Sequence, residues 1–332
     1  MIVLAHDKLG FRFPDIHEKA VFNIAFQRTL RIPDDGKEYP LPAGLGNFPL
    51  RHIEDYANKL PGEAISRGGV LLPMYQSEAL WINFSGGYPM AIKIGTGKIN
   101  AITGKKWKNE LNRKKQDYVV VPDQPWLDGY NVEEDLIRQF VAMPLGEGYS
   151  AEEQITGKSE FGGLQIIAYP MKKHAYEEYR KRKEESGLVK NMMCEDIKFS
   201  KVCASYSPMG MAAGGLMRQT IYEDEYGLDV WDQDNGSRCF IHLMNSESYK
   251  SITGEMPPYP PITGKDYRSH GIPWFDYYSD GNSLSGSKTL NKLKNLAKMA
   301  KKKKQPLKDN ESIDVSGTQV IRKGNQVSEG AF

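Results

Sequence analysis

The residues in this chain that are best suited to chemistry are tryptophan and aspartate side chains in two short segments. Asp123 and Asp128 flank Trp126 in PDQPWLDG, and Asp276 follows Trp274 in GIPWFDYY. Aromatic rings pack on the apolar faces of sugars, while carboxylates bind hydroxyl groups or act as acid and base. The pattern predicts a pocket for a carbohydrate or related small ligand. The alternative is a pair of packing anchors, because Pro-Trp loops bury their rings and Asp-Gly forms turns.

A glycine-containing loop at residues 143–149 (MPLGEGY) is a second candidate contact surface. Its glycines would let the backbone approach a ligand, and Glu147 and Tyr149 would supply polar contacts. A wide hairpin between two strands explains the same residues equally well. We include Glu147 and Tyr149 among the candidate ligand-binding residues and leave both interpretations open.

The segment RCFIH, residues 238–242, is where nucleophilic chemistry would be sought. On a regular strand Cys239 and His242 point to opposite faces, so they do not pair as nucleophile and base. Cys239 beside Ile241 instead indicates a small buried side chain. The six histidines show no HxH, HxxxH or HExxH spacing. We predict no catalytic residue, no metal centre and no cofactor.

Acidic residues at Asp232 and Asp234 offer the oxygen ligands that calcium prefers. However, the glycine of DQDNG comes one position too early for an EF-hand loop, and Leu243 stands where that loop needs glutamate. A solvated turn before the next strand is the expected structure. The glycine-containing segments at 95–98 (GTGK) and 210–215 (GMAAGG) likewise match no phosphate-binding motif.

Positive charge is concentrated at the C-terminal end of the chain. From Ser287 onward 11 Lys and Arg face 4 Asp and Glu, a net charge of +7, so the total of +2 leaves −5 for residues 1–286. Proteins that bind nucleic acid with their folded domain usually carry a net positive charge there, and residues 1–286 do not. The basic segment would attract an acidic protein, a second copy of the chain, nucleic acid or an anionic membrane surface, unless it is simply solvated. Eight lysines are the candidate partner-binding residues: Lys288, Lys292, Lys294, Lys298, Lys301, Lys302, Lys303 and Lys304.

The overall composition is that of a globular protein, with 332 residues, 39% hydrophobic and 26% charged. Three cysteines without a CxxC pair argue against a disulfide framework or a cysteine-rich zinc site. The first ten residues do not resemble a signal peptide, and no stretch approaches the roughly 18–20 apolar residues of a transmembrane helix. We expect a cytoplasmic protein.

Short alternating segments separated by turn residues predict a mainly β, α+β fold. Antiparallel sheets in a sandwich or barrel-like arrangement, with a few surface helices, suit this density of strands. We expect helices at 50–60 and 172–186. Strands are expected at 20–32, 69–103 (a meander), 117–122, 139–143, 164–169, 198–206, 216–222 and 237–244, and residues 271–278 are expected to wrap over the core in extended form.

The end of the chain has a different character from the rest. A flexible linker composition at 281–287 precedes leucines and alanines that mark one helical face up to Lys301–Lys304. Residues 305–332 are polar, with strand character only at 318–322. We therefore expect a β-rich body at 1–286 and a detachable basic helix and tail at 287–332.

Five segments of the body resemble a group of uncharacterised microbial proteins. They are RTLRIPDDG (28–36), VPDQPWLDG (121–129), RQFVAMPLGEGY (138–149), RCFIHLMNS (238–246) and GIPWFDYY (271–278). The resemblance covers most of residues 20–280. It implies that the body is one evolutionary unit, and it transfers no catalytic residue.

These patterns predict a non-enzymatic β-rich scaffold or binding protein whose basic segment contacts an acidic partner, with self-assembly as one form of that contact. One alternative is a carbohydrate or small-ligand binder or hydrolase that uses the Trp and Asp loops. Another is weak binding of nucleic acid or a membrane surface through the basic segment. The ligand pocket requires the loops at 123–128 and 274–280 to converge on one concavity.

Overall fold

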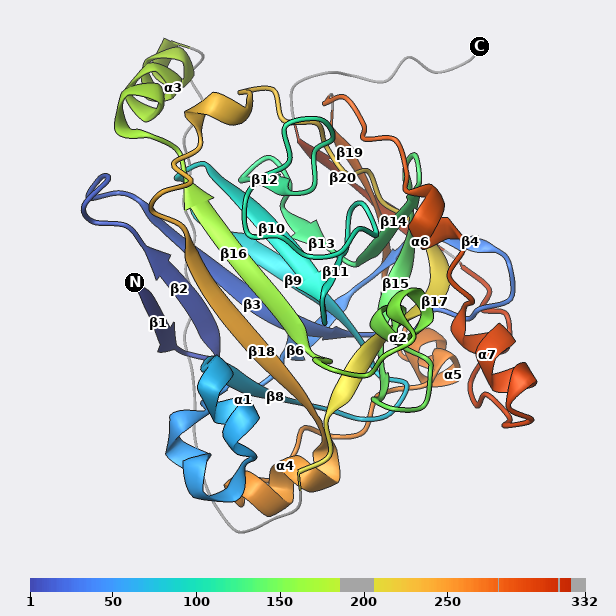
Figure 1. The fold of residues 1–332 in the computed structure, drawn as a ribbon. Coiled ribbons are helices and arrows are strands. Elements are labelled where there is room, and N and C mark those ends of the chain that lie inside the picture. The colour runs from blue at the N-terminus through green and yellow to red at the C-terminus, as the bar shows by residue number, and fades with distance from the viewer. Residues whose placement is uncertain (186–205, 280, 316, 324–332) are drawn as a thin grey trace, which may run out of the picture.

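Two large β-sheets packed face to face form the centre of the computed structural model, which describes residues 1–185, 206–279, 281–315 and 317–323 (Figure 1). A third, three-stranded sheet completes the architecture, and the helices are short and lie around the sheets. This arrangement confirms the predicted β-rich α+β sandwich.

The first sheet has ten strands and a path that begins at the N-terminus. Its main order is β1 (Ile2–Ala5), β2 (Lys8–Arg12), β3 (Val21–Thr29), β9 (Ala79–Ser85), β15 (Leu136–Pro144), β17 (Met209–Arg218) and β4 (Glu38–Tyr39). Three further strands pair with this path: β6 (Gly44–Asn47), β13 (Trp126–Leu127) and β14 (Gly129–Glu133).

The second sheet has seven strands. Its order is β11 (Ile99–Asn100), β10 (Met90–Thr96), β16 (Leu164–Pro170), β18 (Ser237–Asn245), β8 (Val70–Met74) and β7 (Arg51–His52), with β12 (Val119–Val121) paired to β10. The core lies between the two sheets, where apolar side chains of both are fully buried: Phe26, Phe140, Ile92, Ile166 and Ile241.

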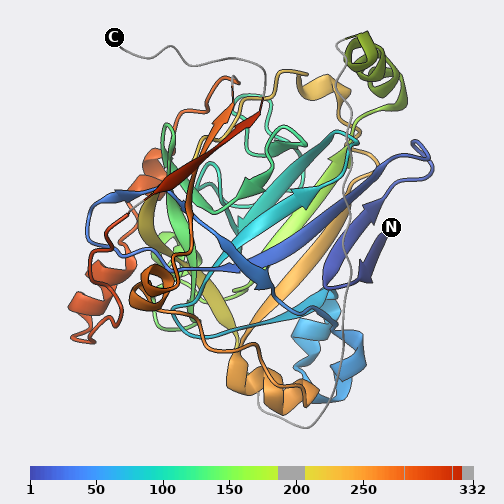
Figure 2. The same cartoon turned by 180° about the vertical axis from the view of Figure 1, so that it is seen from behind.

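The third sheet joins β5 (Leu41–Pro42) to β19 (Trp274–Ser279) and β20 (Thr318–Lys323). Seen from behind, β20 crosses in front of the sandwich as a dark red arrow (Figure 2). Three pairs are parallel, namely β17 with β4, β18 with β8, and β19 with β20. The prediction of antiparallel sheets therefore holds for most pairs, while these three sheets are mixed.

The meander expected at 69–103 is correct for β10 and β11, which pair antiparallel, and wrong for β8 and β9. Strands β8 and β10 belong to the seven-stranded sheet, whereas β9 between them belongs to the ten-stranded sheet. The connections from β8 to β9 and from β9 to β10 therefore cross from one sheet to the other. Strands of both sheets contribute apolar side chains to the core between them. Strand β17 also begins seven residues before the expected 216, and residues 198–205 lie outside the described part of the chain.

The helices and helical turns are η1 (Glu54–Lys59), α1 (Gly62–Arg67), α2 (Ala151–Thr156), α3 (Lys173–Glu185), η2 (Leu228–Val230), α4 (Ser246–Thr253), α5 (Gly264–Ser269), α6 (Lys288–Asn291) and α7 (Leu296–Lys302). The charged helix α3 matches the expected one and packs through Tyr176 and Tyr179. The helix expected at 50–60 is a 3-10 turn instead. This turn ends at Lys59, and Pro61 is the N-cap residue of α1.

Candidate functional site

The lysine-rich segment that follows Ser287 lies on the body of the protein. Helix α6 contacts β14 and helix α7 contacts β17. Their apolar side chains are buried against the sandwich: Leu290, Leu293, Leu296, Met299 and Ala300. The expectation of a detachable helix is therefore corrected for residues 288–302. The sequence showed an apolar face, but the surface that this face covers is set by distant parts of the chain.

Polar contacts at the start of each helix fix this segment to the body. The Ser287 hydroxyl donates to the carbonyl of Thr103 at 2.7 Å and caps α6. The Asn295 side chain caps α7 and also donates to the buried carboxylate of Asp34. The backbone N–H of Ala297 donates to the other Asp34 oxygen at 3.0 Å. Two caps with partners in the body hold the lysines in fixed positions.

Asp34 is the acidic residue that ties α7 to the ten-stranded sheet. Burial raises the pKa of its carboxyl group, against the opposing effects of the Ala297 N–H and the Arg138 guanidinium. The Arg138 Nη1 lies 3.4 Å from the Asp34 Oδ1. A carboxylate held this way loses its partners if the helix moves, so the contact favours one position of α7.

A groove of about 770 Å³ lies between α6–α7 and residues 147–155, which include α2. We call it the basic groove. Its charged lining residues are Lys292, Lys294, Lys302, Lys303 and Glu147, a net charge of +3. Its apolar lining residues are Ile155, Leu293 and Met299. Half of the eight predicted partner-binding lysines thus share one concave surface.

The other four predicted lysines lie outside this lining. They are Lys288, Lys298, Lys301 and Lys304, and all four are exposed. These four side chains do not line the groove, but their charges add to the positive electrostatic potential around it. The side chain of Lys294 is also exposed, while its backbone N–H and carbonyl are both held by the Gln154 amide of α2.

The loop residues Glu147 and Tyr149 hold the end of α7. The Lys303 ammonium lies 4.7 Å from the centre of the Tyr149 ring and 3.7 Å from the Glu147 carboxylate. The Tyr149 hydroxyl donates to the Gln305 side chain at 2.7 Å. Of these two predicted ligand-binding residues, Glu147 lines the basic groove and Tyr149 does not, and the partners of both are side chains of the same protein.

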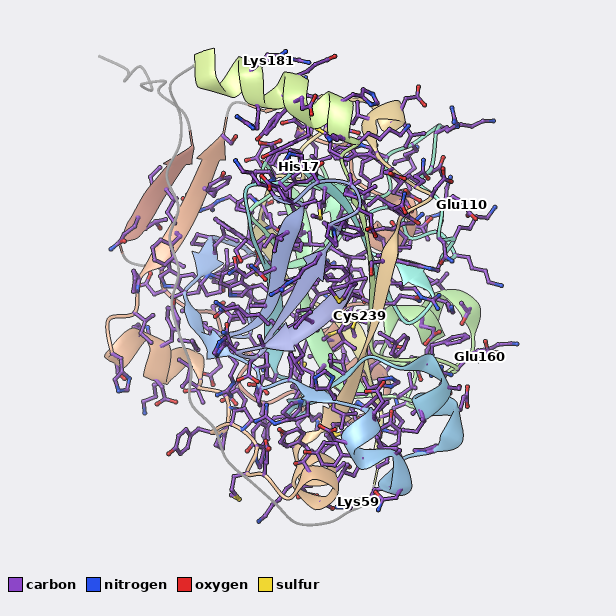
Figure 3. All side chains as sticks on the ribbon, turned by 90° about the vertical axis from the view of Figure 1, so that its left-hand side faces the viewer. His17, Lys59, Glu110, Glu160, Lys181 and Cys239 are labelled. Atoms are coloured by element: carbon purple, nitrogen blue, oxygen red, sulfur yellow. The ribbon has the colours of Figure 1, made fainter. Side chains whose placement is uncertain are left out.

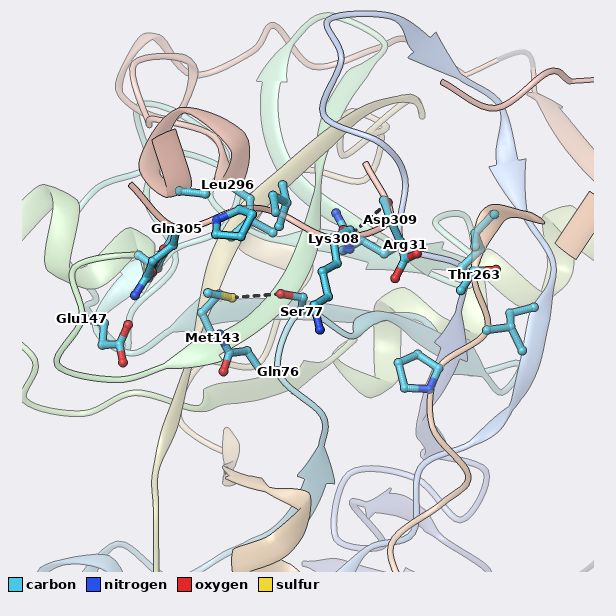
Figure 4. Close-up of a pocket in the computed structure, with 18 residues that line it drawn as sticks. Arg31, Gln76, Ser77, Met143, Glu147, Thr263, Leu296, Gln305, Lys308 and Asp309 are labelled. Carbon is cyan, nitrogen blue, oxygen red and sulfur yellow. Dashed lines mark hydrogen bonds between the residues drawn. The ribbon is translucent and has the colours of Figure 1, made fainter. Parts of the chain in front are cut away.

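A second cavity, of about 520 Å³, is lined by Tyr149 and shares Glu147 with the basic groove (Figure 4). Arg31, Lys308 and Asp309 lie together toward one end of it, and Glu147 lies at the other. The Arg31 guanidinium donates to the carbonyls of Lys308 and Asp309, and burial lowers its pKa. The arginine thus fixes residues 308–309 as a wall of this cavity.

The two Trp and Asp loops converge as the ligand hypothesis requires. Trp126 and Asp276 both line a third cavity, of about 240 Å³, together with Arg218 and Tyr277. The rings of Trp126 and Tyr277 pack edge to face with centroids 4.9 Å apart. Two of the five predicted residues of these loops therefore meet at one concave surface.

Two of the remaining three residues of these loops, Asp123 and Trp274, have structural contacts. Asp123 accepts a hydrogen bond from the Tyr226 hydroxyl at 2.7 Å. Trp274 is buried, 5.1 Å from the ring of Tyr267 and 6.2 Å from the ring of Tyr39. For these two residues the packing-anchor interpretation is the better description.

Asp128 is fully buried beside the third cavity and has no cationic partner among its hydrogen-bond donors. The Gln219 side chain donates to it at 2.6 Å. Burial raises the pKa of Asp128 to about 7, while hydrogen bonds from the side chains of Gln219 and Trp126 act in the opposite direction. The carboxyl group thus titrates near neutral pH at the base of the Trp126 loop.

Sequence reasoning missed Arg218 and Tyr277 as members of the third cavity. Arg218 ends β17 and carries no motif, and its approach to Asp276 depends on how β19 docks. Tyr277 stands beside Asp276 in the aromatic segment FDYY, which was the available signal. Gln154 and Ile155 of the basic groove were missed for the same reason, because α2 meets the segment between α6 and α7 only in the folded chain.

Cys239 is buried in the middle of the body, whereas Lys181 of α3 lies at its outer edge (Figure 3). Burial raises the pKa of the Cys239 thiol to about 12 and lowers the pKa of His242 to about 4. The His242 ring is held by the carbonyl of Gly68. The prediction of a buried Cys239 is confirmed.

Asp232 accepts two hydrogen bonds from Asn235 in the turn before β18. Within the described ranges, no three His, Cys, Asp or Glu side chains are grouped so that they could hold a metal ion. In the same part of the chain, no helix has the length and apolar character needed to cross a membrane. No family model, curated protein or solved structure matches this chain.

Proposed function

We propose that this chain is a non-enzymatic β-rich binding protein whose basic groove takes an acidic segment of a partner polypeptide. The observation that carries the proposal is the groove itself, in which four lysines line the same concave surface as three apolar side chains. Opposite charge steers such a partner to the site, where the half-buried Ile155 is the most accessible of the apolar lining residues.

The chemistry of the lining favours a polypeptide over nucleic acid. Single-stranded nucleic acid is held by aromatic rings or arginine planes that stack on its bases. The residues that line the basic groove include neither an aromatic side chain nor an arginine. The half-buried Ile155 and the small exposed parts of Leu293 and Met299 instead offer a limited apolar contact for one side chain of a polypeptide.

A membrane surface is the weaker alternative for a similar reason. A helix binds a bilayer by inserting its apolar face between lipids. The apolar faces of α6 and α7 are already buried against the body, at Leu290 and Leu296 among others. Only the lysine charges remain for lipid, and each contributes about 1 kcal/mol near an anionic surface.

A second copy of the chain is one candidate for the acidic partner. Residues 1–286 carry a net charge of −5, which complements the basic segment of a neighbouring molecule. The cytosolic setting expected from the cysteine content belongs to this proposal as well, and the buried thiol of Cys239 agrees with it.

The experiment compares three labelled probes with the wild-type protein at low salt: a glutamate–tyrosine copolymer, a single-stranded oligothymidylate and phosphatidylserine vesicles. We expect the copolymer to bind most tightly, and its affinity to fall between about 50 and 200 mM salt, since exposed charges are screened. Sedimentation of the free protein over the same salt range detects self-assembly.

The decisive variant reverses three lysines of the groove, as Lys292→Glu, Lys294→Glu and Lys302→Glu. Lys303 stays unchanged because it holds the groove wall. The matched control reverses three exposed lysines elsewhere, Lys105, Lys106 and Lys108. We expect the groove variant to bind the copolymer more than about tenfold more weakly. An equal loss in the control variant, or a preference for the oligonucleotide or the vesicles, would contradict the proposal.

A further inference from the structure

The third cavity is a separate site on the molecule, and its lining shares no residue with the basic groove. It lies where the loop before β13, the end of β17 and strand β19 meet. Its volume of about 240 Å³ is smaller than the roughly 300–1,000 Å³ of pockets for drug-sized ligands. The size suits a ligand of about one ring.

One part of the cavity lining is aromatic. Trp126 and Tyr277 line it, and both remain partly exposed. Trp81 of β9 supports Trp126 from behind, with ring centroids 5.9 Å apart and planes at 65°. Rings held edge to face by their neighbours stay in place without a ligand, so little side-chain freedom is lost on binding.

Another part is polar and carries both signs of charge. The Arg218 guanidinium donates to both oxygens of Asp276, at 2.8 and 3.1 Å from Nη2. The side chains of Arg218 and Asp276 remain 46% and 39% exposed. Asp135 also lines the cavity and accepts from the Thr220 hydroxyl at 2.7 Å. One arginine and two aspartates give the lining a net charge of −1, which disfavours an anionic ligand.

Two glutamines brace these parts against each other. The Gln124 amide donates to the carbonyls of Trp126 and Thr220 and accepts from the N–H of Tyr222. The Gln219 amide accepts from the N–H of Asp128 and donates to its carboxylate. The loop at 124–128 and the chain after β17 therefore form a rigid frame, with the cavity between them.

We infer that this cavity binds a single neutral saccharide ring. The aromatic side chains match the apolar face of such a ring, while Asp276, Asp135 and Arg218 offer acceptors and donors for its hydroxyl groups. Neither anionic sugars nor phosphates fit the charge of the lining. The site goes beyond the proposed function, since it uses different residues and a different class of ligand.

The test measures binding of D-glucose, D-galactose, D-mannose and N-acetyl-D-glucosamine to the full chain by saturation-transfer NMR. We expect at least one sugar to bind with a millimolar Kd. Trp126→Ala should weaken that binding at least about fivefold. Arg218→Ala tests the same site at a partly exposed residue, so a folding defect in the tryptophan variant does not decide the result.

The basic-groove variant with Lys292, Lys294 and Lys302 reversed is the control, and it should bind the sugar as the wild type does. This control separates failure of the saccharide site from failure of the proposed function. The inference is overturned if none of the four sugars binds, if Arg218→Ala leaves sugar binding unchanged, or if choline binds in place of the sugars.

Discussion

The side chain of Asn295, at the start of α7, donates a hydrogen bond to the buried carboxylate of Asp34. This contact joins the lysine-rich end of the chain to the segment that leads into β4 and places α7 against the ten-stranded sheet. The lysines are consequently displayed by a fixed surface. A positive charge held in place binds a partner at a smaller entropic cost than one on a free tail.

The first prediction concerns this anchor. Asn295→Ala removes both the cap of α7 and a donor to Asp34, so we expect the free energy of unfolding to fall by about 2 kcal/mol. Asn291→Ala is the matched control, because the side chain of the exposed Asn291 of α6 donates to the Glu133 side chain and caps no helix. Urea unfolding of both variants measures the difference. Equal effects would show that α7 is not anchored through Asn295.

The second prediction concerns the apolar face of α7. Leu296 is 1% exposed, so Leu296→Ala should lower the free energy of unfolding by about 3 kcal/mol through lost burial and the cavity that remains. Lys298→Ala on the same helix should change it by less than about 0.5 kcal/mol, since that side chain is exposed. If Leu296→Ala had no effect in thermal unfolding, the basic segment would be a detached tail after all.

The third prediction concerns pH. The pKa of Asp128 is about 7 in the folded protein, above its ordinary value near 3.9. Because the folded state holds the proton more tightly, this residue's contribution to stability falls as pH rises from about 4 to 7, by roughly 1.4 kcal/mol per pH unit. Asp128→Asn removes that dependence.

We therefore expect Asp128→Asn to gain stability relative to the wild type by about 3 kcal/mol as the pH is raised from 5 to 8, whatever its offset at pH 5. The exposed Asp135→Asn serves as the control and should show no such trend. Denaturant melts across this pH range provide the measurement. A constant difference between Asp128→Asn and the wild type would refute the raised pKa.

Much of the fold could be predicted because its signals are local. Alternating apolar residues at 20–32 and 237–244 gave β3 and β18, and the charged run before Ser186 gave α3. The partners of each strand could not be predicted in this way. Strand β8 pairs in parallel with β18, far along the chain, because sheet pairing depends on long-range packing that no short segment encodes.

The candidate sites, too, could be predicted only in part from the sequence. The lysines and the Trp126 loop stood out by residue type alone, and both line cavities in the structure. Their partners Gln154 and Arg218 come from distant elements and have no distinctive neighbours in sequence. Residue type indicated which side chains are suited to binding, while the fold determined which of them meet.

Lysine footprinting tests the central claim most directly. The protein is acetylated with and without the glutamate–tyrosine copolymer, and the modified lysines are identified by mass spectrometry. The basic groove predicts that Lys292, Lys294 and Lys302 are protected by the copolymer while Lys105, Lys106 and Lys108 react as before. Equal protection of both sets, or protection of the second set alone, would contradict it.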